Sequence, residues 1–308
     1  MERLAERLGA SDLVIIDGGM GSELQARGVA MDRAAWSARA NLERPDMVQQ
    51  IHEDYISAGA EVLIANTYAA SRLLLRGAGL EDRFVEVNKR AVDAAMAARE
   101  ATGAADVVIA GSISLGVAVD FMSGGSTSEF DGAELEDLFA EQAELLKDSG
   151  VDLLALEMIM AASYGVSAVD AALDTGLPVW LGVSAELTRN GRVVALDDET
   201  TTLDDLLDAL VRPSLQAVNV MHSAVAATGP ALEVVARHFT GARGAYPESG
   251  DWVPPTWVFS DVSPEALVAS AAAWVDSGAQ IVGGCCGTGP AFIEALREIR
   301  PTGGAGAL

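Results

Sequence analysis

The stretch 57–68, SAGAEVLIANTY, decides the fold of this chain because it joins the end of one element to the start of the next. The small residues and Gly59 end an amphipathic helical pattern, and a short apolar run that finishes in polar residues follows. The same arrangement returns at 148–157, DSGVDLLALE, and at 276–284, DSGAQIVGG. Each stretch predicts a helix, a glycine stop and a strand, which is the repeating unit of an α/β chain.

Eight short apolar runs of this kind recur along the sequence. They are residues 13–17, 61–66, 106–112, 152–157, 178–184, 215–222, 242–246 and 280–284, and ARGAY at 242–246 is the weakest. Near-continuous apolar runs are typical of buried parallel strands. Eight of them in alternation with helices predict a single (β/α)8 TIM barrel, with a doubly wound open sheet as the alternative.

The segments between these runs carry helical patterns. Residues 45–57, 81–101 and 133–148 place apolar side chains on one face, and Ser263-Pro264 opens a further helix with a capping residue and a first-turn proline. The acidic stretch 197–208 is expected to be a loop that leads into a helix. No linker divides the chain, so we predict one barrel domain over residues 1–300 and a frayed tail over 301–308.

Composition excludes several classes of function. The 308 residues carry a formal charge of −25, which disfavours binding to nucleic acid and to anionic membrane surfaces. The longest uncharged stretch, 213–232, is too polar to span a bilayer, and no export signal is visible. We therefore expect a cytoplasmic protein that acts on small molecules. The sequence leaves homo-oligomerisation open.

In a TIM barrel the chemistry lies at the carboxyl ends of the strands. The predicted strands end in polar or sulfur-containing residues, which should converge on one rim: Asp17, Gly18, Gly19, Asn66, Tyr68, Ser112, Glu157, Ser184, Asn219, His222, Cys285 and Cys286.

The adjacent Cys285 and Cys286 are the only cysteines, which excludes a framework of disulfides. Thiolates are strong zinc ligands, and a catalytic zinc ion usually has three protein ligands and one open position. Of the three histidines, His52 and His238 fall on helical patterns and only His222 falls at a strand end. A Cys2His zinc site is therefore predicted, the alternative being a buried apolar cysteine pair and a histidine without metal.

Asp17 and Glu157 end apolar strands, where a carboxylate is costly unless it has a partner. We predict that they bind a substrate ammonium group, with a salt bridge to an arginine as the alternative. The only lysines, Lys89 and Lys147, lie on helical patterns. An aldolase that forms a Schiff base on a strand lysine is therefore disfavoured.

Several segments together resemble one known family. They are DGGMGSELQARG (17–28), WSARANLERPDMVQQIH (36–52), AGAEVLIANTY (58–68), AGSI (110–113), GVDLLALE (150–157), YPESG (246–250), FSDVSPE (259–265) and, most specifically, IVGGCCGTGPAFIEAL (281–296). They resemble the homocysteine S-methyltransferase family over almost the whole chain. The resemblance implies a TIM barrel that binds zinc through three cysteines and transfers a methyl group from a sulfonium, betaine or similar donor to homocysteine.

The resemblance identifies Cys285 and Cys286 as the paired zinc thiolates. The first family cysteine follows an asparagine, and here that pair is Asn219-Val220, so valine stands at the ligand position. His222 lies two residues further on, which in a regular strand is the same face as position 220. We therefore predict His222 as the substitute ligand, which makes the metal set one unit less negative.

The resemblance also implies that Asp17 and Glu157 hold the amino-acid substrate and that Trp36 lies on the methyl-donor side. Two further departures from the family pattern are Met158, where threonine is usual, and Glu248, where asparagine is usual.

The sequence therefore predicts a zinc-dependent S-methyltransferase that uses a small donor such as S-methylmethionine and gives methionine from homocysteine or a related product from another thiol. Asp17 and Glu157 are the predicted catalytic residues, and His222, Cys285 and Cys286 the predicted metal ligands. The predicted substrate-binding set is Asp17, Gly18, Gly19, Trp36, Asn66, Tyr68, Glu157, Ser184 and Asn219. Two alternatives are a non-catalytic paralogue that binds a thiol or amino acid, and a zinc lyase or hydrolase with Glu157 as general base.

Overall fold

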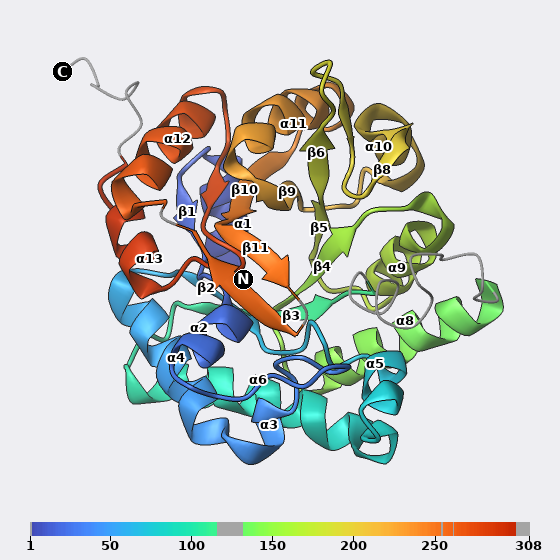
Figure 1. Cartoon of the computed structure of the whole chain (residues 1–308), viewed down its shortest axis with the longest axis vertical. Coiled ribbons are helices and arrows are strands. Elements are labelled where there is room, and N and C mark those ends of the chain that lie inside the picture. Colours follow the sequence, from blue (N-terminus) through green and yellow to red (C-terminus); the bar gives the residue numbers. More distant parts are fainter. Residues whose placement is uncertain (1, 116–131, 254, 261, 300–308) are drawn as a thin grey trace.

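Eight parallel strands form one sheet that closes on itself, which confirms the predicted barrel (Figure 1). The computed structural model describes residues 2–115, 132–253, 255–260 and 262–299. The strand order is β1-β13-β10-β9-β5-β4-β3-β2, and a parallel bridge from Ile16 to Val62 joins its two ends. The strands are β1 (Val14–Ile15), β2 (Val62–Ala65), β3 (Val108–Ile113), β4 (Leu153–Ile159), β5 (Val179–Val183), β9 (Ala217–Ala224), β10 (Ala242–Glu248) and β13 (Ile281–Val282).

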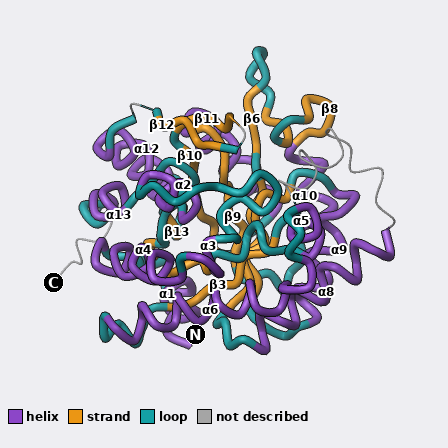
Figure 2. Tube along the Cα trace, turned by 60° about the horizontal axis from the view of Figure 1, so that its bottom comes forward, coloured by secondary structure: helices purple, strands orange, loops and turns teal. Residues whose placement is uncertain are grey.

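Helices surround this sheet, as the tube view shows (Figure 2). They are α2 (Met20–Ala26), α3 (Ala40–Glu43), α4 (Pro45–Ala58), α5 (Arg72–Gly77), the 3-10 turn η1 (Glu81–Arg83), α6 (Phe84–Ala101), α8 (Gly132–Asp148), α9 (Ala162–Asp174), α10 (Leu203–Leu210), α11 (Val225–His238), α12 (Pro264–Asp276) and α13 (Pro290–Leu296). The helices predicted at 45–57, at 133–148 and from residue 264 are confirmed. The pattern at 81–101 divides into η1 and α6.

The buried side chains form two clusters, one on each face of the sheet. The inner cluster fills the barrel and includes Val14, Val62 and Leu153 of the strands. Leu4 and Leu8 of α1 (Glu2–Gly9) join it, so α1 closes the amino-terminal end of the barrel. The outer cluster packs strand side chains against the helices. Because both faces of the sheet are covered, the strands are apolar on both sides, as expected of a parallel sheet.

The weakest predicted strand is complete in the structure. Residues 242–248 form β10, which pairs with β9 and β13. Its low β-propensity has a packing cause at Gly244, where a Cβ atom would lie 2.3 Å from the Asn219 Oδ1 and 2.6 Å from the Ile281 Cβ. A larger residue at this position would collide with both neighbouring strands.

Two small sheets were not predicted. The stretch 197–208 was expected to be a loop before a helix, but Asp198–Thr202 forms β8 and pairs with β7 (Val193–Ala195), which pairs with β6 (Ala185–Leu187). The threonine-rich sequence favours a strand once β7 offers a partner. A hairpin of β11 (Gly250–Val253) and β12 (Thr256–Phe259) follows β10. The predicted frayed tail, 301–308, lies outside the described residues, and the domain boundary at residue 300 stays a prediction.

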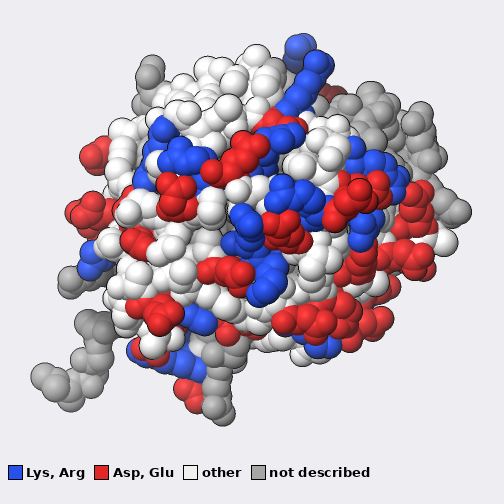
Figure 3. Space-filling model, turned by 90° about the horizontal axis from the view of Figure 1, so that it is seen from below, with Lys and Arg blue, Asp and Glu red and all other residues white. Residues whose placement is uncertain are grey.

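The charged side chains lie mainly on the outside. Acidic and basic groups are interspersed on the face shown in Figure 3. Lys89 on α6 and Lys147 on α8 are ion-paired with Asp93 and Glu144 at the surface, so neither lysine reaches the interior of the barrel. Within the described residues, no helix has the length and apolar character needed to cross a membrane.

Candidate active site

A pocket of about 260 Å³ lies at the carboxyl ends of the barrel strands. Nine of the predicted site residues line it: Gly18, Gly19, Trp36, Asn66, Tyr68, Glu157, His222, Cys285 and Cys286. Asp17, Ser184 and Asn219 are fully or almost fully buried and are not among the lining residues. The barrel thus brings most of the predicted residues to one cavity.

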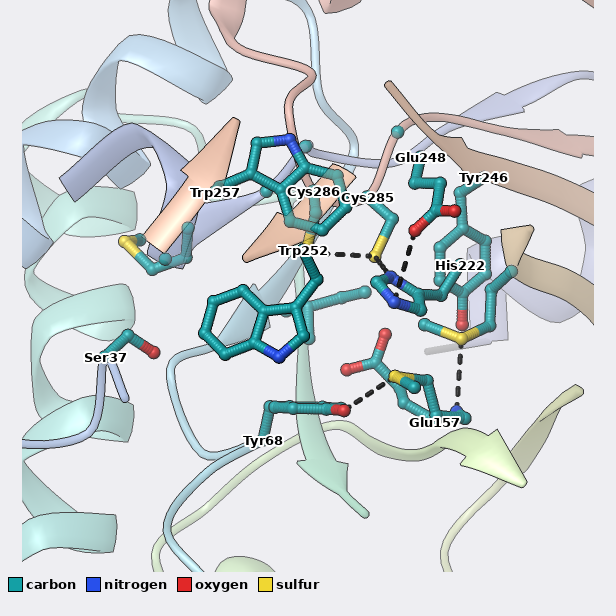
Figure 4. A pocket seen from close by; sticks show the side chains of 18 of the residues that line it. Ser37, Tyr68, Glu157, His222, Tyr246, Glu248, Trp252, Trp257, Cys285 and Cys286 are labelled. Carbon is teal, nitrogen blue, oxygen red and sulfur yellow. Dashed lines mark hydrogen bonds and ion pairs between the residues drawn. The ribbon is translucent and has the colours of Figure 1, made fainter. Parts of the chain in front are cut away.

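Two sulfur atoms and one imidazole nitrogen meet at the wall of this pocket (Figure 4). The Cys285 Sγ lies 3.4 Å from the His222 Nδ1 and 4.0 Å from the Cys286 Sγ, and the three ligand atoms lie within 4.8 Å of one another. Tetrahedral zinc with ordinary bond lengths separates two sulfur ligands by about 3.8 Å and a sulfur from a nitrogen by about 3.5 Å. The residues present therefore fit a metal ion with three protein ligands.

His222 reaches this cluster through an irregularity of β9. The pairing of β9 with β10 shifts between Tyr246 and Glu248, so the segment around His222 is bulged, and His222 itself has a positive φ of 43°. Val220, two residues earlier, belongs to the outer cluster that packs on the helices. In a regular strand His222 would share that outward face. The residue predicted as a ligand is therefore in place, but the argument from strand alternation was wrong and the bulge is the reason.

The second ring nitrogen of His222 faces a carboxylate. Its Nε2 lies 3.2 Å from the Glu248 Oε2. Burial would lower the pKa of His222, but the neighbouring Cys285 sulfur and the Glu248 carboxylate outweigh it and raise the pKa to about 9. The hydrogen bond with Cys286, together with burial, raises the pKa of the Cys285 thiol well above its ordinary value.

Glu157 and Asp17 are two buried carboxyl groups that lie near each other. Burial raises the pKa of Glu157 to about 7, against a hydrogen bond donated by the Ser112 hydroxyl. Burial and the nearby Glu157 raise the pKa of Asp17 well above its usual range, although one of its oxygens accepts the Ile64 N–H at 2.9 Å. Neither forms an ion pair with an arginine among the described residues. A bound cation would therefore stabilise the ionised form of both.

Aromatic rings line much of the pocket, Tyr68, Trp252 and Trp257 among them (Figure 4). The Trp36 ring packs edge-on against Tyr68 and Trp252, with centroid separations of 6.3 Å and 5.7 Å. Trp257 of β12 lies 5.9 Å from the His222 ring. Such rings present faces and edges that can surround a compact cation.

Backbone strain concentrates around this pocket. Of the described residues other than glycine, five have a positive φ, and four of these line the cavity: Trp36, Met158, Asp197 and His222. Such conformations cost about 1–3 kcal/mol each and persist where the surrounding structure imposes them. The strain therefore singles out the pocket as the candidate site independently of its side-chain chemistry.

Other predicted residues support the site rather than face its centre. A Cβ at Gly18 or Gly19 would collide with the carbonyl oxygens of Thr288 and Cys285, so these glycines let the cysteine loop approach β1. The Asn66 amide is occupied by hydrogen bonds with Ser37 and Asn41. It therefore holds the segment that carries Trp36 against the end of β2.

Two buried residues of the predicted set point elsewhere. The Ser184 hydroxyl contacts the Met221 sulfur at 3.4 Å. Both amide atoms of Asn219 are buried without a hydrogen-bond partner among the described residues, and Asn219 packs against Gly244 in the neighbouring strand. Their predicted contact with substrate stays a prediction.

Sequence reasoning missed part of the lining. Trp252, Trp257 and Asp251 belong to the β11–β12 hairpin above the barrel, Asp197 directly precedes β8, and Met20 and Met221 contribute thioethers. The sequence WVPPTW at 252–257 contains a signal that was available, since two tryptophans flank a proline pair of the kind that marks a turn.

Comparison with known proteins identifies the family. A family model described as homocysteine S-methyltransferase matches residues 14–300. The chain belongs to the homocysteine S-methyltransferase family. The predicted membership and the prediction of a methyltransferase enzyme are thereby confirmed.

Relatives of this family match along nearly their full length. The homocysteine S-methyltransferase of Escherichia coli K12 is 29% identical, with 94% of this chain and 96% of the relative covered. The selenocysteine methyltransferase of Astragalus bisulcatus is 28% identical, with 96% and 94% covered. The metallated form of the E. coli homocysteine methyltransferase MmuM superposes with a TM-score of 0.78 at 26% identity, over 93% of this chain and 96% of that one.

Proposed function

We propose that this chain is a zinc-dependent thiol S-methyltransferase that moves a methyl group from a small sulfonium donor to homocysteine or a related thiol, which gives methionine in the case of homocysteine. The observation that carries the proposal is the cluster of His222, Cys285 and Cys286 in the wall of the pocket, where the Cys285 Sγ lies 3.4 Å from the His222 Nδ1 and 4.0 Å from the Cys286 Sγ. Family membership supports the reaction class.

His222, Cys285 and Cys286 would hold the ion and leave one position open to the pocket. Zinc, when bound there, lowers the pKa of a coordinated thiol and keeps it as the thiolate. The remaining requirement is an orientation in which the substrate sulfur faces the donor methyl group.

Glu157 would anchor the amino acid through its ammonium group, with Asp17 adding negative charge from behind the pocket wall. Neither carboxyl group forms an ion pair with an arginine or a lysine among the described residues, and burial raises the pKa of each, although the charge of His222 acts against this at Glu157. An ammonium ion in the pocket supplies the missing counter-charge and stabilises the carboxylates.

The donor would lie against the aromatic wall. Trp36, Tyr68 and Trp252 surround that part of the cavity, and Asp197 and Asp251 line it with carboxylates. In the transfer, the substrate thiolate forms the new S–CH3 bond as the S–CH3 bond of the donor breaks. The electron pair of the broken bond stays on the donor sulfur, which becomes a neutral thioether, and the thiol proton leaves to solvent.

The test is methyl transfer assayed on metal-quantified protein with homocysteine and a panel of donors that includes S-methylmethionine, S-adenosylmethionine and glycine betaine. We expect about one zinc ion per chain, methionine formation with a sulfonium donor, and loss of both in Cys285→Ala and His222→Ala. The surface variant Lys89→Ala serves as the matched control. Undiminished turnover by metal-free protein would overturn the proposal.

A further inference from the structure

Glu248 and its two neighbours in the chain contact all three proposed ligand residues. On one side of it, the Pro247 carbonyl accepts the Cys285 N–H at 2.8 Å, and on the other, the Ser249 N–H donates to the Cys286 carbonyl at 2.8 Å. Its own side chain meets the His222 ring. The end of β10 therefore contacts all three residues that carry the ligand atoms.

The two ring nitrogens of His222 have different neighbours. Nδ1 lies 3.4 Å from the Cys285 sulfur, and Nε2 lies 3.2 Å from the Glu248 Oε2, on the opposite edge of the ring. A carboxylate accepts and does not donate, so Nε2–H faces Glu248. In the neutral ring that a metal ion requires, the lone pair is then on Nδ1, which faces the sulfur cluster. Figure 4 shows the ring between Cys285 and Glu248.

The contact is shielded from water on both sides. Only 13% of the His222 side chain and 20% of the Glu248 side chain are exposed to solvent. His222 also has a strained backbone in the bulge of β9, so its direction depends on what surrounds the ring. Glu248 is the carboxylate that contacts the His222 ring at Nε2, on the edge opposite the sulfur atoms.

We propose that Glu248 is the positioning residue of the metal site: it fixes His222 in the tautomer and orientation that turn Nδ1 toward Cys285 and Cys286. The inference rests on the proposed zinc site. It also accounts for charge, because exchanging a thiolate for a neutral imidazole removes one negative charge from the ligand set and Glu248 returns one next to the ring. A carboxylate in this role makes the histidine a more basic ligand.

The consequence is that two of the three departures from the family pattern, at positions 220 and 248, concern the same ligand. Position 220, where the family has a cysteine, faces outward here. His222 presents the third ligand atom from the bulge, and Glu248 meets its ring. His222 without Glu248 should be a weaker ligand, even though its backbone and the two cysteines are unchanged.

The test measures zinc affinity by chelator competition in Glu248→Gln and Glu248→Leu, with circular dichroism and thermal unfolding as checks of folding. Glutamine keeps an acceptor for Nε2–H and removes the charge, and leucine removes both. We expect affinity to fall by about 10-fold in the first and by up to about 100-fold in the second. Glu199→Gln makes the same charge change on the exposed part of β8 and should leave affinity unchanged.

Cobalt(II) gives a second measurement that does not depend on turnover. In the wild-type protein and Glu199→Gln the sulfur-to-cobalt and d–d absorption bands should coincide, and in Glu248→Leu the d–d bands should change as the imidazole ligand is lost or reoriented. Wild-type zinc affinity and an unchanged cobalt spectrum in folded Glu248→Leu would overturn the role of Glu248 while leaving the metal site intact. Wild-type affinity in His222→Ala, or no metal in the wild-type protein, would overturn the proposed ligand set itself.

Discussion

Two buried residues with unpartnered polar atoms play different parts in this molecule. Asp17 has one carboxylate oxygen without a hydrogen-bond partner among the described residues, and it directly precedes the pocket-lining Gly18. Both ring nitrogens of His52 are also buried without a hydrogen-bond partner among the described residues, but His52 lies on α4, in the layer of helices. An unpartnered buried polar group costs about 1–3 kcal/mol, so the first fits a site that awaits a ligand and the second is a cost to stability.

His52 makes stability depend on pH. Burial lowers its pKa from the ordinary value of 6.5 to about 3. The folded protein therefore keeps the ring neutral while the unfolded chain binds a proton below pH 6.5, so stability is complete above that pH and falls as the pH decreases toward 3. We expect His52 to cost about 2 kcal/mol of unfolding free energy between pH 7.5 and pH 5.

Denaturant unfolding of the wild-type protein and His52→Leu at both pH values checks this expectation. The variant should lose about 2 kcal/mol less than the wild type over the same interval, because leucine cannot bind the proton. Parallel pH dependence in the two proteins would contradict it.

The strand β9 contributes both to the packing of the barrel and to the pocket. Val218 and Val220 pack in the outer cluster with the helices, whereas Ala217 and Met221 face the barrel interior. The bulge then changes the alternation, so that His222 joins the pocket. A ligand in this strand therefore depends on where the bulge lies and not only on the residue type.

This geometry predicts which position can supply a third ligand. In the His222→Ala background, Val220→Cys should not restore zinc binding, because a side chain at position 220 packs among apolar residues outside the barrel. His222→Cys should retain about one zinc ion per chain, since a thiolate at this position lies beside the other two sulfurs. Metal content after dialysis checks both; stoichiometric zinc in the Val220→Cys, His222→Ala protein would show that the strand can shift its bulge.

The two parts of the proposed metal site are remote in sequence and adjacent in the barrel. His222 ends β9 and Cys285 follows β13, with β10 between these strands in the sheet. An ion bound there links the two ends of this three-strand unit. Binding to the folded state alone stabilises it in proportion to the logarithm of the free ligand concentration.

Zinc should therefore raise the stability of the whole molecule. At a free concentration about 1,000 times its dissociation constant, the expected gain is about 4 kcal/mol, seen as a higher midpoint of thermal unfolding. Differential scanning calorimetry with zinc and with a chelator measures it, and Cys285→Ala serves as the control that should show little gain. Equal gains in both proteins would place the stabilising ion elsewhere.

The sequence predicted the barrel because repeated apolar runs, glycine stops and amphipathic helices are local patterns with a period of one βα unit. It also predicted nine of the residues that line the pocket, since residues at the carboxyl ends of parallel strands must converge on one rim. It did not predict β8 or the β11–β12 hairpin, whose strands are defined by partners that a single stretch of sequence does not reveal.

The sequence by itself determined the family and the barrel, and it singled out Cys285, Cys286 and His222 as the proposed metal ligands. Only the tertiary structure decided that His222 enters the pocket through a bulge, that Val220 faces outward and that Glu248 meets the ring. The physical reason is that patterns of apolar residues specify which face of a strand is buried, whereas the direction of one side chain at a bulge depends on the pairing of neighbouring strands.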